Sequence, residues 1–112
     1  MSEYVKEITQ ADFEAEVAKS TLPVVLDFFS TECPPCEALA PKFEAVAEQF
    51  AGKALFLKIF RQGNKDIASR LGVTGSPTLL FFKGGAEQGE RMSGEEIRRT
   101  VIKAQVESLL GA

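Results

Sequence analysis

The sequence predicts an α/β fold with a central mixed sheet of four to five strands, flanked on both faces by about four helices. Short apolar runs rich in β-branched and aromatic residues alternate along the chain with longer amphipathic segments. This alternation is typical of helices packed on a sheet whose parallel strands are joined by right-handed crossovers. The length of 112 residues suits one hydrophobic core, so residues 1–112 are expected to form a single domain.

The first elements follow from apolar patterning. Tyr4–Ile8 alternates weakly and is expected to form a short edge strand. Thr9–Asp12 resembles a capping box with Asp in place of Glu, and it predicts a helix that buries Phe13 and Val17. Leu22–Phe29 is almost continuously apolar, which is the pattern of a strand covered on both faces.

The next segment, from Pro34 to Phe50, predicts a long amphipathic helix. Pro41 removes a backbone donor inside it and predicts a kink. The helix is expected to end at Gly52. Its inward face is predicted from helical spacing to consist of Leu39, Phe43, Val46, Ala47 and Phe50.

Two further buried strands and a short helix are predicted in the middle of the chain. Ala54–Phe60 and Thr78–Phe82 are the strand candidates, and the second ends at the turn Lys83–Gly85. Between them, Lys65–Leu71 predicts a short helix stopped by Gly72.

The last part of the chain predicts a weak strand and a terminal helix. Ala86–Met92 contains a glycine and three charged residues and is expected to pair back only weakly. Ser93–Glu96 has the pattern of a second capping box, which would start the terminal helix. Its inward-facing residues are predicted to be Ile97, Val101, Ile102, Val106 and Leu109.

Composition limits the functional classes. A formal net charge of −3 argues against nucleic acid as a partner, because no basic face would neutralise phosphates. No apolar run approaches the length of a membrane span. The N-terminal residues lack a basic start followed by an apolar run, so no secretory signal is expected and the cytoplasm is the default compartment. A monomer is the default oligomeric state.

Cys33 and Cys36 are the only cysteines, and they lie where the apolar strand meets the long helix. In a reducing compartment such a pair is more often catalytic or metal-binding than a structural bridge. A structural zinc site requires four ligands, and the chain has no histidine and no further cysteine. The pair is therefore interpreted as a redox-active dithiol that needs no bound cofactor, with no metal site.

The two sulfurs are expected to differ in role. Cys33 should precede the first helical turn, where unpaired N–H groups and the helix dipole favour a thiolate nucleophile. Cys36, one turn further along, should be more buried and act as the resolving thiol. Pro34 and Pro35 are compatible with a first helical turn, where missing N–H groups cost little, and they stiffen the loop.

Three carboxylates lie near the pair. Glu32 and Glu37 oppose the helix dipole and disfavour a thiolate by repulsion. Asp27 is embedded in an apolar strand, where a carboxylate is costly unless it is paired or protonated. The plainer interpretation of Asp27, a polar group at a strand end that reaches water, stays open from the residues alone.

With a Cys-x-x-Cys pair on a strand-to-helix turn in a βαβ pattern, the chain resembles the thioredoxin family over nearly its whole length. Further positions also match the family. Asp27 lies six residues before Cys33, and Pro41 lies five residues after Cys36. Lys58 matches as well, and so does the pair Ser76–Pro77, which follows Gly72–Gly75. The chain departs from the family at Glu32 and Phe29, where tryptophan is common, and at Pro34–Pro35, where Gly-Pro is usual. It has no tryptophan at all.

The resemblance implies roles for several residues. Asp27 would transfer a proton toward Cys36, with Lys58 tuning that carboxylate. The Ser76–Pro77 bond would be cis and would expose the Ser76 backbone for pairing with an extended substrate. The expected substrate-binding residues are Gly75, Ser76 and Pro77 together with Pro34, Pro35 and Glu32.

The function implied is a thiol-disulfide oxidoreductase that reduces protein disulfides through a mixed-disulfide intermediate. Its electrons would come from a flavin-dependent thioredoxin reductase or an equivalent. One alternative is a disulfide oxidase or isomerase working at a less reducing potential. Another is a partner-binding subunit that keeps the fold without turnover, since fold does not determine function.

Overall fold

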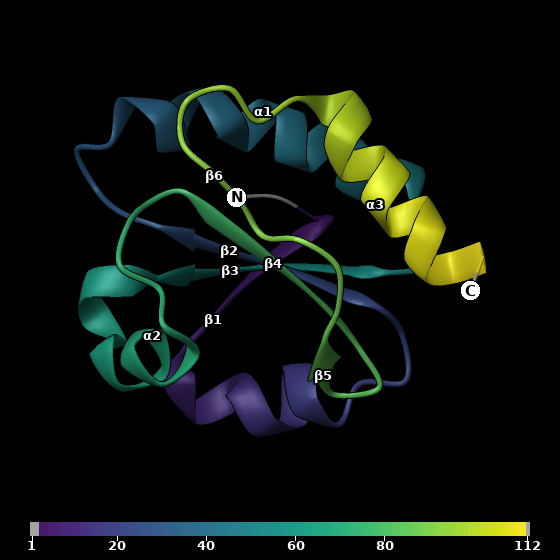
Figure 1. The fold of residues 1–112 in the computed structure, drawn as a ribbon, viewed down its shortest axis with the longest axis horizontal. Coiled ribbons are helices and arrows are strands. Elements are labelled where there is room, and N and C mark those ends of the chain that lie inside the picture. Colours follow the sequence, from purple (N-terminus) through teal and green to yellow (C-terminus); the bar gives the residue numbers. More distant parts are fainter. Residues whose placement is uncertain (1–2, 112) are drawn as a thin grey trace.

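The computed structural model describes residues 3–111 and contains one mixed sheet (Figure 1). The strands run in the order β1-β3-β2-β4-β5, and β6 also pairs with β4. Their bounds are β1 Val5–Ile8, β2 Val24–Phe29, β3 Leu55–Phe60, β4 Thr78–Lys83, β5 Ala86–Glu87 and β6 Met92–Ser93. The first three strands are mutually parallel where they pair, whereas β4 is antiparallel to β2, β5 and β6. The predicted mixed sheet is therefore confirmed, and β1 forms its expected edge.

The four longer strands are those predicted. The weak C-terminal pairing is split into β5 and β6, each of two residues, which brings the sheet to six strands. Both short strands pair with β4, and regular pairing is interrupted at residues 88–91 between them.

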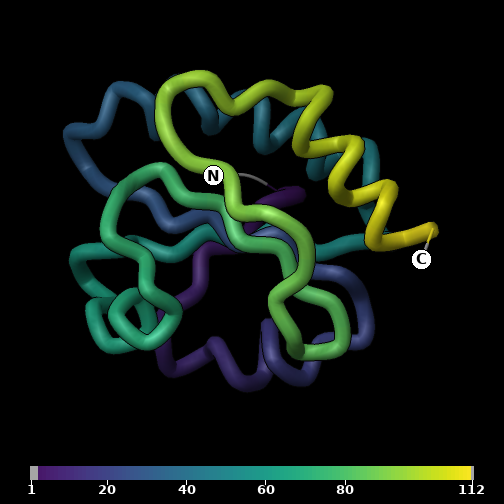
Figure 2. Tube along the Cα trace, in the orientation of Figure 1, coloured from purple at the N-terminus to yellow at the C-terminus, as the bar shows by residue number. Residues whose placement is uncertain are grey.

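Helices cover both faces of the sheet. The α-helices are α1 Pro34–Gln49, α2 Lys65–Leu71 and α3 Arg99–Gly111, and the shorter turns are η1 Gln10–Asp12, η2 Glu14–Ala18 and η3 Arg61–Gly63. Helices α1 and α3 run side by side over one face, whereas η1, η2 and α2 lie on the other (Figure 2). Among the described residues, no helix is long and apolar enough to cross a membrane.

Alternation along the strands divides the core in two. In β4, Leu79 and Phe81 face α1 and α3, whereas Leu80 and Phe82 face η2 and α2. All four side chains are at most 3% exposed. The central strands are thus buried on both faces, which explains their continuous apolar runs in the sequence.

The N-terminal helix differs from the regular one predicted. It is a 3₁₀ turn, η1, followed by the π-helical turn η2, although Phe13 and Val17 are buried as expected. The Asp12 carboxylate accepts a hydrogen bond from the Thr9 backbone N–H over 3.0 Å, which is the acidic half of the predicted capping box.

The predicted start of the terminal helix is wrong. Ser93 pairs with Thr78 in β6 and cannot cap a helix, and α3 begins six residues later, at Arg99. Val101 was expected to face inward but is 48% exposed, because the buried stripe of α3 follows Ile102 and Val106 at helical spacing. Ile97 is buried as predicted, although it lies before the helix.

One buried polar side chain joins three elements near the end of β3. Asn64 is 6% exposed, and its Oδ1 accepts from the Gln10 backbone N–H over 2.8 Å. Its Nδ2 donates to the Phe60 carbonyl, also over 2.8 Å. Asn64 thereby ties η1 to the end of β3 at the start of α2.

Asn64→Ala is expected to lower the free energy of unfolding by about 2–4 kcal/mol, because it leaves a backbone donor and a backbone acceptor without their partner. Urea unfolding would measure the change. The control is Gln62→Ala at an exposed position two residues earlier, expected to stay within about 0.5 kcal/mol of the original protein. Equal effects of the two substitutions would contradict the role given to Asn64.

Candidate active site

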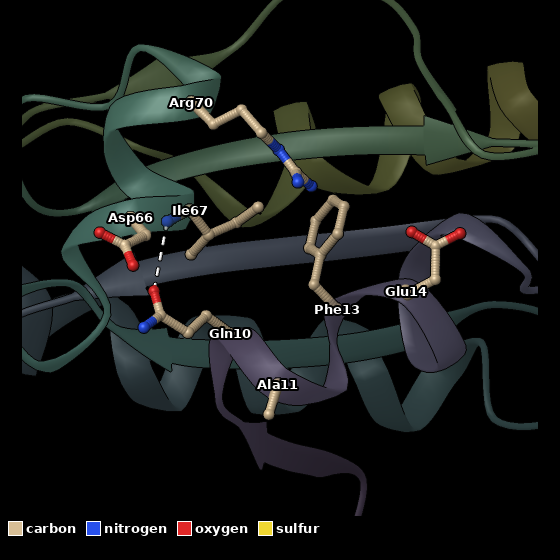
Figure 3. Close-up of a pocket in the computed structure, with 7 residues that line it drawn as sticks. All are labelled: Gln10, Ala11, Phe13, Glu14, Asp66, Ile67 and Arg70. Atoms are coloured by element: carbon tan, nitrogen blue, oxygen red, sulfur yellow. Dashed lines mark hydrogen bonds between the residues drawn. The ribbon is translucent and has the colours of Figure 1, made fainter.

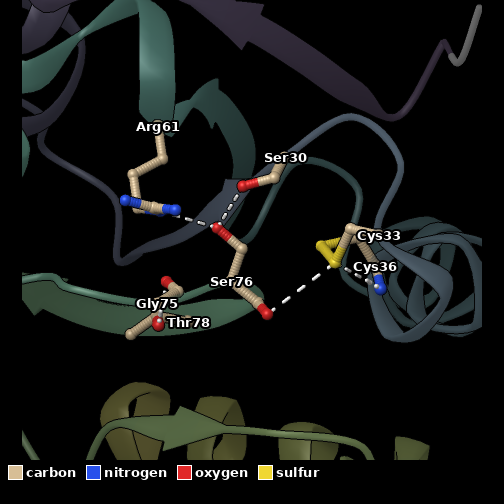
Figure 4. Close-up of a disulfide and its surroundings, with 7 residues drawn as sticks. All are labelled: Ser30, Cys33, Cys36, Arg61, Gly75, Ser76 and Thr78. Atoms are coloured by element: carbon tan, nitrogen blue, oxygen red, sulfur yellow. Dashed lines mark hydrogen bonds between the residues drawn. A yellow bond between two sulfur atoms is a disulfide. The ribbon is translucent and has the colours of Figure 1, made fainter.

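Cys33 and Cys36 are joined by a disulfide at the start of α1, with their Cα atoms 5.2 Å apart (Figure 4). Cys33 is half-buried, whereas Cys36 is only 7% exposed. The two cysteines thus differ in accessibility as the sequence predicted: Cys33 is reachable from solvent, whereas Cys36 is buried.

The N-terminus of α1 is built around the Cys33 sulfur. Cys33 is the N-cap residue, and its Sγ accepts from the Cys36 backbone N–H over 3.3 Å. Pro34 and Pro35 occupy the first two helical positions, where the missing N–H groups forfeit no helical hydrogen bond. The sulfur therefore lies at the positive end of the helix dipole, in contact with an amide donor, and this arrangement favours a thiolate after reduction.

Glu32 shapes the turn before the dithiol in a way that sequence patterns did not reveal. Its φ is +52°, in the left-handed region that residues with a side chain seldom adopt. The side chain is exposed. This residue therefore lies on the turn from the end of β2 into α1 and carries an exposed carboxylate next to Cys33 in the sequence.

The loop before β4 lies against the dithiol. The Ser76–Pro77 peptide bond is cis, as predicted, and Pro77 is buried. The Ser76 carbonyl oxygen is 3.7 Å from Cys33 Sγ. The Thr78 hydroxyl donates to the Gly75 carbonyl over 2.8 Å, which holds the preceding turn.

A groove of about 420 Å³ runs along this loop. It is lined by Gly72–Thr78 on one side and by Arg91, Ser93 and Gly94 on the other. The Arg91 guanidinium holds the second wall in place, since it donates to the Glu87 carboxylate and to the Leu71 carbonyl at the end of α2. The wall that contains Ser76 connects the groove to the dithiol, through the Ser76 carbonyl beside Cys33 Sγ.

The Ser76 side chain belongs to a hydrogen-bonded group that sequence reasoning missed. Ser30 Oγ lies 2.6 Å from Ser76 Oγ, and Arg61 Nε donates to the same oxygen over 2.9 Å. These residues are 46 and 15 positions from Ser76 in the sequence, and no local motif connects them. Only the pairing of strands brings them together.

Asp27 lies in the middle of β2 and is 5% exposed. Alternation places its side chain on the face covered by α1, opposite Leu26 and Phe28. Its Oδ1 is buried and has no hydrogen-bond partner among the described residues. A hollow of about 340 Å³, lined by Asp27, Lys58 and residues of α1 including Pro41 and Glu44, connects this face to solvent.

Burial raises the pKa of Asp27 to about 7, because desolvation penalises the carboxylate, and the nearby positive charge of Lys58 offsets only part of this effect. Lys58 is the direct neighbour of Asp27 across β2 and β3. Its ammonium lies 5.3 Å from the centre of the Phe29 ring.

A hollow on the other side of the sheet lacks the dithiol and the buried carboxyl group described above. It has a volume of about 330 Å³, lies between η1 and α2 and is lined by Gln10, Ala11, Phe13, Glu14, Asp66, Ile67 and Arg70 (Figure 3). It has no thiol and lies on the side of the sheet opposite α1. Within residues 3–111, no cluster of three or more histidine, cysteine or acidic side chains could hold a metal ion.

Comparison with known proteins agrees with this site. The family model described as Thioredoxin matches residues 4–108. The chain belongs to the thioredoxin family. A thioredoxin of Pseudomonas aeruginosa is 33% identical over 112 residues, which cover 100% of this chain and 98% of that protein. A thioredoxin of Haemophilus influenzae is 41% identical over 85 residues, or 76% of this chain and 78% of the other.

Family membership and the paired cysteines together establish the activity. The mixed sheet with helices on both faces is the thioredoxin fold, as the resemblance implied. The chain is a thiol-disulfide oxidoreductase whose redox group is the Cys33–Cys36 disulfide. Thioredoxins in general act on protein disulfides and are reduced again by a reductase, and their chemistry needs no cofactor.

The pKa of Asp27 predicts a stability change with pH. The unfolded chain loses this proton near the ordinary value of 3.8, whereas the native protein keeps it up to about pH 7. Between these values the native state binds more protons, so the free energy of unfolding falls as pH rises. Asp27→Asn should therefore be more stable than the original protein above about pH 8, by up to roughly 4 kcal/mol, and gain nothing below about pH 4.

Urea unfolding of the oxidised proteins across this pH range measures the difference. Asp66→Asn, at an exposed position on α2, is the control and should change stability by less than about 1 kcal/mol at any pH. A constant difference between Asp27→Asn and the original protein would show that the carboxylate does not titrate as stated.

Proposed function

We propose that this protein reduces disulfides in other proteins, with Cys33 as the nucleophile and Cys36 as the resolving thiol. The supporting observation is the position of Cys33 Sγ, which caps α1 and lies 3.7 Å from the Ser76 carbonyl beside an open groove. A substrate segment bound along the groove would bring its disulfide to this sulfur.

The reaction takes place in two exchanges. The Cys33 thiolate attacks one sulfur of the substrate disulfide, a mixed disulfide forms, and the other substrate sulfur leaves as a thiolate that takes up a proton. Cys36, deprotonated, then attacks the Cys33 sulfur and releases the second substrate thiol. The protein is left with the Cys33–Cys36 disulfide, and two electrons have passed to the substrate.

Asp27 is the proposed proton acceptor for Cys36. It lies beneath α1 on the face of the sheet where Cys36 is buried, and a pKa of about 7 suits a group that both takes and returns a proton near neutral pH. Lys58 tunes this carboxylate, because its charge keeps the Asp27 pKa lower than burial alone would make it.

The proposed substrate-binding residues surround the sulfur. Ser76 offers a backbone carbonyl for pairing with an extended segment, and Gly75 and Pro77 form the adjoining wall of the groove. Glu32, Pro34 and Pro35 lie on the α1 side, where Glu32 and Pro34 are exposed and Pro35 is half-buried.

We further propose that the protein works in the cytoplasm as a single-domain monomer and receives its electrons from a flavin-dependent thioredoxin reductase. A reducing compartment would keep the dithiol ready for attack. The alternatives of a disulfide oxidase or isomerase differ in potential, so equilibration with a glutathione redox buffer separates them from a reductase. A partner-binding subunit without turnover would not need both sulfurs beside the groove.

Insulin reduction by dithiothreitol tests the proposed activity. The unmodified protein should accelerate the reaction, whereas Cys33→Ser, which keeps the size of the side chain but replaces the attacking sulfur, should fall to the uncatalysed rate. Precipitation of the released insulin chain provides the measurement. Equal rates for the two proteins would refute the assignment of Cys33.

A second experiment isolates the role of Asp27. Asp27→Asn should slow release of the substrate from the mixed disulfide by about 100-fold, because Cys36 loses its proton acceptor, but should spare alkylation of Cys33 by iodoacetamide. Lys58→Met keeps the carboxylate and should instead move the pH dependence of this step to higher pH. An unchanged release rate in Asp27→Asn would leave Asp27 without a part in the reaction.

A further inference from the structure

Arg61 places a cation beside the substrate-binding loop, and the reaction described above does not use it. It is the first residue of η3, directly after β3, and its Nε donates to Ser76 Oγ over 2.9 Å. Ser30, on the turn after β2, contacts the same oxygen over 2.6 Å. Figure 4 shows the Ser76 side chain turned toward Arg61 and Ser30 and its carbonyl turned toward Cys33.

Most N–H donors of the Arg61 guanidinium have no hydrogen-bond partner among the described residues. Arginine carries five N–H donors, and the contact with Ser76 uses one of them. Among the described residues, no carboxylate lies within 4.0 Å of Arg61 to neutralise it. The side chain is half-buried, and its position is set by the hydrogen bond to Ser76. A guanidinium held in this way is suited to bind a carboxylate through two parallel hydrogen bonds.

The charges around the dithiol are unevenly distributed. Glu32 and Glu37 are exposed at the start of α1. Arg61 lies on the far side of Ser76 from the dithiol (Figure 4). An extended segment that pairs with the Ser76 backbone would therefore meet carboxylates on one side of the reacting sulfur and a cation on the other. The net charge of −3 would repel an acidic substrate at long range, so any preference for one must come from local contact.

We propose that Arg61 is a specificity-determining residue, whose guanidinium, held by its hydrogen bond to the Ser76 hydroxyl, pairs with a carboxylate of the substrate. The preferred substrates are then protein disulfides in which Asp or Glu adjoins the attacked half-cystine on one side. This inference rests on the proposed reduction of protein disulfides and names the substrate class that Arg61 would select.

The test uses four short peptides, each activated as a mixed disulfide with pyridine-2-thiol and otherwise uncharged. They carry Glu or Gln at the residue before or after the cysteine. In a single turnover of the reduced protein, the Cys33 thiolate bonds to the peptide sulfur and the bond to the pyridyl sulfur breaks, because that thiol is the better leaving group. Pyridine-2-thione is released and followed by its absorbance, and Cys36 then displaces the peptide as a thiol.

At one of the two positions, the Glu peptide should react about threefold to tenfold faster than its Gln counterpart. Arg61→Gln should bring this ratio close to one, and Arg61→Lys should keep part of it, because a charge remains without the fork of donors. The ratio compares two peptides on the same variant, so a general loss of groove structure cancels from it.

Arg70→Gln is the matched control, since it removes one positive charge from the other side of the sheet. Arg70 lies 5.3 Å over the Phe13 ring in the hollow of Figure 3, away from the dithiol. This variant should keep the original ratio. The inference is overturned if the original protein reacts equally with Glu and Gln peptides, if Arg61→Gln preserves the ratio, or if Arg70→Gln lowers it as much. Failure of every peptide to react would instead count against the proposed function.

Discussion

Strand β2 pairs with β3 on one side and with β4 on the other, and the position of every group in the site depends on this double pairing. Because β2 and β3 are parallel, their carboxyl ends lie at the same end of the sheet, and the antiparallel β4 begins at that end. The chain therefore brings the turn before α1, the start of η3 and the loop before β4 together. Cys33, Arg61 and Ser76 come from these three segments and are neighbours for that reason alone.

Asp27 is an ionisable side chain in the core, and burying its carboxylate costs free energy. Every other side chain of β2 between Val24 and Phe28 is apolar and almost fully buried, whereas Asp27 carries a carboxyl group into the same layer. Its neighbour Lys58 and the adjoining hollow supply a counter-charge and a route for solvent, which moderate the cost without removing it. If Asp27 transfers a proton as proposed, this buried carboxyl group is an instance of stability exchanged for activity.

Sequence patterns predicted the long strands, α1, α2 and the dithiol because each depends on residues close together in the chain. Apolar runs indicate buried strands, and the left-handed Gly72 ends α2 where expected. The errors arose where tertiary pairing overrides local pattern: Ser93 has the context of a helix cap but joins β6, and Val101 is apolar but exposed. The Ser30–Ser76–Arg61 group was invisible for the same reason, since its members are separated in sequence and carry no motif.

The division of the C-terminal pairing into β5 and β6 has a consequence for the behaviour of the protein in concentrated solution. On the side of β4 that faces away from β2, two residues pair with β5 at one end and two pair with β6 at the other. Between them, the Gln88 backbone N–H donates to the Phe81 carbonyl and occupies the middle of that side. On this side of β4, an unfolded or neighbouring polypeptide therefore finds no continuous row of free amides to pair with, which disfavours association of copies through this apolar strand.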